Sequence, residues 1–98
     1  MSYLEKLEDL VNAFNEGFES IENPEELIKA TESANEAILK MTLSDEDKNA
    51  LATACIDAAS LIDIDSNLSR QDVINSFKAN LTEELEHLDS SRKSISFS

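Results

Sequence analysis

The sequence predicts an all-α fold, either a small antiparallel four-helix bundle or two packed helical hairpins. Three observations support this prediction. The chain of 98 residues contains one glycine and one proline, too few for a protein built from tight turns and sheet corners. Four segments repeat apolar residues at steps of three and four, the period of an amphipathic helix. Each segment follows a residue pattern typical of a helix start.

The first helix is expected to begin at Ser2, which forms a capping-box pattern with Glu5. The second is expected at Asn23-Pro24, where an N-cap residue precedes a proline at the first helical position. Their apolar stripes predict two buried faces. These consist of Leu4, Leu7, Val11, Phe14, Phe18 and Ile21 in the first helix, and of Leu27, Thr31, Ala34, Ile38 and Met41 in the second.

The third helix is expected to begin at Ser44 and the fourth at Ser69, since serine is a favoured N-cap residue. Leu68 and Val73 have the spacing of a hydrophobic staple across the second of these starts. The expected inner faces are Leu51, Ala54, Cys55, Ala58, Leu61 and Ile62, then Val73, Ile74, Phe77, Leu81, Leu85 and Leu88. Residues 1–88 are therefore predicted to form a single helical domain, and residues 89–98 a flexible polar tail.

In the first predicted helix, the apolar residues are spaced by three or four residues over its whole length. This apolar stripe suits either the inside of the fold or a seam against a second copy of the chain. A chain this short buries only a thin core, which self-association would stabilise. A monomer and a homodimer are both consistent with the sequence.

The chain has an unusually large negative charge for its length. It has 21 acidic and 8 basic residues, a net charge of −13, and residues 1–47 hold 13 of the acids but three of the bases. Direct binding to nucleic acid or to an anionic membrane is disfavoured, because no basic stripe is present to contact phosphates. The expected partner is a protein with a basic surface.

The acidic residues of the first two predicted helices have two interpretations. They form either a solvated face that keeps the protein soluble or an electrostatic docking surface, for which the candidates are Glu16, Glu19, Glu22, Glu25 and Glu26. We expect a non-enzymatic protein that works by protein–protein binding, as an inhibitor, adaptor or assembly factor. The short, very acidic chain resembles phage-encoded DNA mimics and inhibitors of bacterial defence systems. That resemblance implies a mobile-element protein that blocks a nucleic-acid-binding enzyme, such as a host defence nuclease.

A calcium site is a third hypothesis. Asp63, Asp65 and Asn67 stand at alternate positions between two predicted helices, which resembles the opening of an EF-hand loop. Leu68 and Ile74, however, occupy the positions where that loop requires a glycine and a bidentate glutamate. The three residues are therefore candidate ligands of a degenerate calcium-responsive helix pair, and the alternative is a loop whose side chains cap helix ends.

Catalysis, a cofactor and a membrane-spanning segment are not expected. The single histidine, His87, lies in no local motif with a nucleophile, and Cys55 falls on an apolar face where a cysteine is inert. Gly17 is the only glycine, so a glycine-rich phosphate loop is impossible. A lone cysteine and an N-terminus without a signal-peptide pattern predict a cytoplasmic protein.

Overall fold

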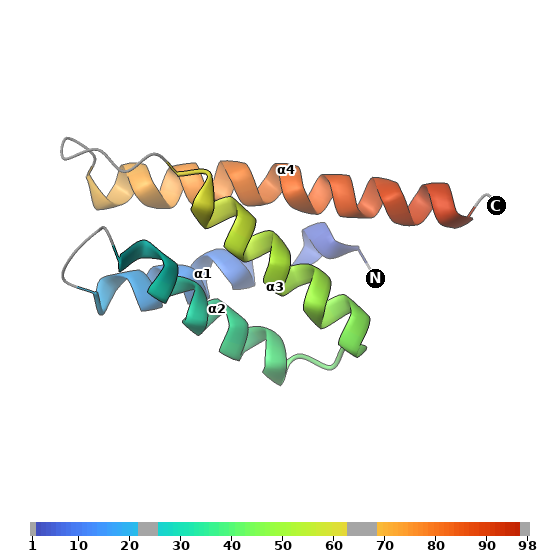
Figure 1. The fold of residues 1–98 in the computed structure, drawn as a ribbon, viewed down its shortest axis with the longest axis horizontal. Helices are drawn as coiled ribbons and strands as arrows, with labels where there is room; N and C mark the ends of the chain where they lie inside the picture. The colour runs from blue at the N-terminus through green and yellow to red at the C-terminus, as the bar shows by residue number, and fades with distance from the viewer. Residues whose placement is uncertain (1, 22–25, 63–68, 97–98) are drawn as a thin grey trace.

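The computed structural model describes residues 2–21, 26–62 and 69–96 of the chain, and nearly all of them are helical (Figure 1). A short 3-10 helix, η1 (Tyr3–Lys6), leads directly into α1 (Leu7–Glu19). Helices α2 (Leu27–Lys40), α3 (Asp45–Ser60) and α4 (Arg70–Ser96) follow. The described residues contain no strand, so the all-α prediction is confirmed.

The four helices form an antiparallel arrangement in which each helix packs mainly on two others. Helix α1 packs on α2 and α4, and α3 packs on the same two neighbours from the other side. Helix α4 is the longest element and extends past the other three at its C-terminal end (Figure 1). None of the described helices combines the length and apolar character that a bilayer-spanning segment requires.

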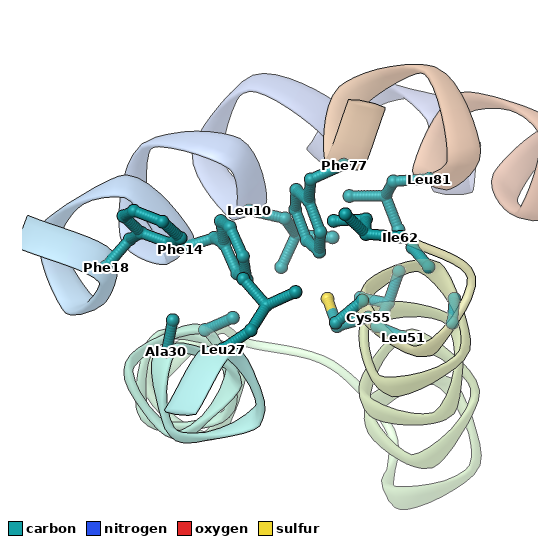
Figure 2. Packing of buried hydrophobic residues seen from close by; sticks show 14 of the residues in the cluster. Leu10, Phe14, Phe18, Leu27, Ala30, Leu51, Cys55, Ile62, Phe77 and Leu81 are labelled. Atoms are coloured by element: carbon teal, nitrogen blue, oxygen red, sulfur yellow. The ribbon is translucent and has the colours of Figure 1, made fainter. Parts of the chain in front are cut away.

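The core lies where the four helices converge (Figure 2). The ring of Phe14 stacks on that of Phe77, with centroids 3.8 Å apart and planes 4° from parallel, and Phe18 follows at 6.0 Å from Phe14. Most of the predicted inner faces of α2 and α4 are buried as expected. The stripe of the first helix thus faces the inside of its own fold, and its phenylalanines are not available as a seam against a second copy.

Two positions of the predicted core are wrong. Leu4 is 36% exposed and belongs to the first turn, which is a 3-10 helix, whereas Leu10, which the predicted stripe omits, is fully buried. Leu61 is 64% exposed because it lies beyond the last residue of α3, at its C-cap.

Two of the predicted helix starts are confirmed. The Ser44 hydroxyl accepts a hydrogen bond from the Asp47 backbone N–H (3.2 Å). At the start of α4, the Ser69 hydroxyl accepts from the Asp72 N–H (3.1 Å), while the Asp72 carboxylate accepts from the Ser69 N–H (3.3 Å), a reciprocal capping pair. The start predicted at Asn23-Pro24 and the staple residue Leu68 lie outside the described residues.

The N-terminus is capped from α4, and the capping box predicted within the first helix is wrong. The Ser2 hydroxyl donates to the Asp89 carboxylate (2.7 Å), which also accepts from the backbone N–H groups of Tyr3 (2.7 Å) and Leu4 (3.2 Å). Asp89 therefore places its negative charge at the positive end of the first helix. Helix α4 continues to Ser96, past residue 88, after which the sequence predicts a flexible tail, and Asp89 takes part in this contact.

The opposite end of α1 is also capped from α4. The Arg70 guanidinium donates to the carbonyl oxygens of Phe18 and Ile21, each at 2.9 Å, and lies over the Phe18 ring. Lysine and asparagine serve other helices in the same way: Lys48 donates to the Leu39 carbonyl (3.2 Å) and Asn80 to that of Ala58 (3.2 Å). In a chain with one glycine, side chains of later helices satisfy carbonyls that a glycine C-cap would otherwise cover.

The one glycine lies at a close contact between α1 and α2. A Cβ atom on Gly17 would lie 2.8 Å from the Ala30 carbonyl oxygen and 2.7 Å from the Ser33 Oγ. These distances are shorter than van der Waals contact, so the backbones can meet here only because position 17 has no side chain.

Candidate functional site

The acidic residues of α1 form one continuous exposed face, which we call the acidic face. Each of the four acidic side chains of α1 is exposed to solvent. At 100° per residue, Glu16 and Glu19 lie on the side of the helix opposite to the buried Phe14 and Phe18. The acidic face consists of Glu8, Asp9, Glu16 and Glu19.

Helix α1 carries the largest net charge of the described helices. Helix α1 carries these four carboxylates and no basic residue. Helix α2 carries two acidic residues, Glu32 and Glu36, and two basic residues, Lys29 and Lys40, so its net charge is zero. Of these two helices, α1 therefore carries the uncompensated negative charge.

Two members of the acidic face stand where the helix itself disfavours them. Glu16 and Glu19 belong to the last turn of α1, which contains no basic residue. The unsatisfied carbonyls of a helix C-terminus carry partial negative charge, so carboxylates there lower helix stability.

Glu26 has a structural explanation instead. It occupies the N-cap position of α2, at the positive end of that helix, and pairs with Lys29 at 3.3 Å. Both side chains are well exposed, so the pair contributes little to stability. Glu22 and Glu25, the two remaining candidates, lie outside the described residues.

The two side chains with catalytic potential, Cys55 and His87, do not belong to the acidic face. Cys55 is fully buried and points into the core beside Leu27 (Figure 2). Burial raises the pKa of its thiol from 9.0 to about 12, so the nucleophilic thiolate is absent at neutral pH. His87 is exposed on α4. The core cysteine thus acts as a small apolar side chain.

A shallow groove runs between α3 and α4. Its volume is about 290 Å³, and its surface is largely apolar. The lining residues are Asn49, Ala50, Thr53, Ala54, Asp57, Glu84 and Leu88. Two carboxylates at the edge give the groove the same negative sign as the acidic face, so it adds no attraction for an anionic ligand.

The predicted calcium ligands Asp63, Asp65 and Asn67 lie outside the described residues. Within residues 2–21, 26–62 and 69–96, no cluster of three acidic, histidine or cysteine side chains is placed to hold a metal ion.

Comparisons with protein-family models, with curated proteins and with solved structures find no match to this chain.

Proposed function

We propose that this is a non-enzymatic protein that acts by binding another protein, as an inhibitor, adaptor or assembly factor, and that the acidic face of α1 docks on a basic surface of that partner. The observation that carries the proposal is the position of Glu16 and Glu19 in the last turn of α1. Carboxylates at this end are unfavourable towards the helix dipole, a cost that the Arg70 cap on the Phe18 and Ile21 carbonyls reduces. We infer that a gain in binding accounts for the acidic residues there. Trade-offs of this kind are common at functional sites.

The geometry of α1 supports a docking role. The helix is held rigidly, because Asp89 caps its beginning and Arg70 its end. The helix backbone that carries the carboxylates is therefore already ordered before binding, which limits the conformational entropy lost by the backbone. A row of one sign also raises the association rate with a basic partner through long-range attraction. The buried Cys55 thiol supports the non-enzymatic assignment and fits a reducing compartment such as the cytoplasm.

A second candidate is a DNA mimic that blocks the binding site of a nucleic-acid-binding enzyme, such as a defence nuclease. Charge spacing favours it. From Glu8 to Glu19, the four carboxylates of the acidic face span eleven residues, or about 16 Å of helix. The average is one charge per about 5–6 Å, with none between Asp9 and Glu16, against one phosphate per about 3.4 Å along a DNA strand. The acidic face can therefore replace part of one strand in a basic groove.

Affinity capture from a lysate of the source cells tests the proposal. The baits are the wild type, a Glu16→Gln, Glu19→Gln variant, and a Glu83→Gln, Glu86→Gln variant. The last is the matched control, because it removes two exposed carboxylates from α4. We expect one basic protein to be retained by the wild type and the control, and to be lost at high salt or from the α1 variant. Equal retention by all three baits would contradict the proposal.

A competition experiment with DNA distinguishes the two candidate functions. If the captured partner binds DNA and this protein competes with a DNA duplex for it, the mimic is supported. A complex that contains the partner, DNA and this protein together would rule out mimicry and leave the adaptor function in place.

A further inference from the structure

The groove between α3 and α4 is open because the two helices diverge. They lie close together near the end of α3, where the Asn80 side chain donates to the Ala58 carbonyl oxygen at 3.2 Å, and they separate towards the start of α3 (Figure 1). In the diverging part, α3 presents the small side chains of Ala50 and Ala54, which leave a space of about 290 Å³ beside Leu88. An apolar surface of this kind favours an apolar occupant.

The edges of the groove carry negative charge. Asp57 of α3 lies along one wall and Glu84 of α4 along the other. Among the residues that the structure describes, no basic side chain pairs with either carboxylate. An apolar groove between two unpaired carboxylates is complementary to a segment that carries both apolar and basic side chains.

The last nine residues of the chain have this composition. Residues 90–98, which we call the C-terminal segment, contain two basic residues and no acidic residue, within a chain that has 21 acidic and 8 basic residues. They also contain two large apolar residues. The four residues are Arg92, Lys93, Ile95 and Phe97. The C-terminal segment is therefore opposite in charge to the groove and to the rest of the chain.

The C-terminal segment cannot enter the groove of its own chain. Helix α4 is continuous from Arg70 to Ser96 and extends past the other three helices at its C-terminal end (Figure 1). Its last turns follow the axis of the same helix that forms one wall of the groove, so they lead away from Leu88. The groove can receive this segment only from a second copy.

Two antiparallel copies of α4 can fill both grooves at once. The groove lies along α4 from Glu84 to Leu88, a rise of about 6 Å, and the helix continues from Ser90 to Ser96 for about 9 Å. A two-fold axis near residue 90 therefore places the last turns of each copy beside residues 84–88 of the other. Such a contact is the same on both copies, so it closes with two chains.

We propose that the α3–α4 groove binds the C-terminal segment of a second copy of this chain, so that two chains form a two-fold dimer by exchanging the ends of α4. The apolar side chains of the segment cover the floor of the groove, and its two basic side chains offset the carboxylates at the edges. Helix α1 does not line the groove. The inference therefore does not depend on the proposed docking function.

Sedimentation equilibrium of the full chain, from micromolar to millimolar concentration, tests the exchange. The apparent mass of the wild type should rise from 10.9 kDa towards twice that value as concentration increases. Two variants each reverse one side of the contact: Asp57→Lys, Glu84→Lys in the groove, and Arg92→Glu, Lys93→Glu in the C-terminal segment. Each variant should raise the dissociation constant of the dimer by at least about tenfold, because like charges then face each other across the contact.

A variant with all four substitutions separates this contact from the overall charge. It keeps the net charge of −13 and restores opposite charges across the groove, so its dissociation constant should return to within about threefold of the wild type. The matched control is Glu32→Lys, Glu36→Lys, which reverses two exposed carboxylates of α2, outside the groove. It changes the net charge as much as the groove variant does. The control should not raise the dissociation constant, because it lowers the repulsion between two acidic copies.

Circular dichroism of every variant checks that it keeps the helical fold. A wild type that stays monomeric over the whole concentration range overturns the proposal. A dimer that the groove and segment variants leave unchanged also overturns it, as does a fourfold variant no tighter than either of them. None of these results bears on the docking function, whose test uses the carboxylates of α1 and a different protein.

Discussion

Replacing Gly17 with alanine tests the contact between α1 and α2 that sets the orientation of the acidic face. Alanine favours a helix over glycine by about 0.8–1 kcal/mol, so helix propensity alone predicts a more stable protein. The structure predicts the opposite. The new Cβ would meet the Ala30 carbonyl oxygen at 2.8 Å, and the Ser33 Oγ and Cβ at 2.7 and 2.9 Å. To restore ordinary contact the helices must separate by over half an ångström.

Overpacking of this kind costs about 1–3 kcal/mol. One of the three contacts is a backbone oxygen, which cannot rotate away, so the upper part of that range applies. After subtraction of the gain in helix propensity, Gly17→Ala should lower the free energy of unfolding by about 1–2 kcal/mol. The corresponding fall in melting temperature is on the order of 5–15 °C for a chain of this size.

Urea denaturation followed by circular dichroism measures the effect. Asn12→Ala is the control, because it changes an exposed position of the same helix and should stabilise by a few tenths of a kcal/mol. In a Ser33→Gly background, two of the three close contacts are absent and the cost of Gly17→Ala should fall. If Gly17→Ala instead stabilises the protein by about 1 kcal/mol, the close approach of α1 and α2 described above is incorrect.

Three further predictions concern capping, the core and the loop after α3. Arg70→Ala and Asp89→Ala should each lower the free energy of unfolding by about 1–2 kcal/mol, and Asp89→Asn by less, as measured by urea titration. Because burial raises the pKa of Cys55 from 9.0 to about 12, the neutral thiol stabilises the fold below pH 9 and this contribution is lost as the pH rises towards 12. At slightly alkaline pH a thiol reagent should therefore react with urea-unfolded protein and not with the folded form; rapid reaction of the folded form would contradict the burial. Millimolar calcium should raise the melting temperature no more than magnesium does, and a calcium-specific rise that disappears in an Asp63→Ala, Asp65→Ala variant would instead establish a calcium site.

Helix starts and most core positions could be predicted from the sequence because their causes are local. Ser44 and Ser69 cap helices through side-chain bonds to residues three positions away. Ser2 shows the same local pattern, yet its hydroxyl is bound by Asp89, 87 positions away in the chain. No local pattern contains that contact, since it exists only when α4 lies antiparallel to α1.

Two positions of the first helix differ from the predicted stripe for a similar reason, although Phe14 and Phe18 are buried as predicted. Leu4, Leu7, Leu10 and Val11 offer more apolar side chains than one face can bury. Packing against α4 and the 3-10 geometry of the first turn bury Leu10 and leave Leu4 partly exposed. Such a choice between neighbouring faces depends on tertiary contacts, which a period of three and four residues does not specify.

Part of the candidate site could be predicted from the sequence. The exposure of Glu16 and Glu19 follows from their spacing relative to Phe14 and Phe18. The sequence alone places Glu26 in the same acidic set as Glu16 and Glu19, because all three are acidic residues of the first two predicted helices. In the structure, Glu26 lies at the N-cap of α2 beside Lys29. The charge balance of each helix, once its bounds are known, separates α1 from α2 and would have narrowed the prediction.

The most direct test of the docking function is the association rate constant with the captured partner, measured by stopped flow or surface plasmon resonance over a range of ionic strengths. The rate for the wild type should fall steeply as salt rises, and that for Glu16→Gln, Glu19→Gln should be lower with a shallower salt dependence. The Glu83→Gln, Glu86→Gln control should stay close to the wild type. The α1 variant should also melt at an equal or higher temperature, because two carboxylates leave the negative end of its helix. Identical, salt-insensitive rates for all three proteins would contradict docking through the acidic face.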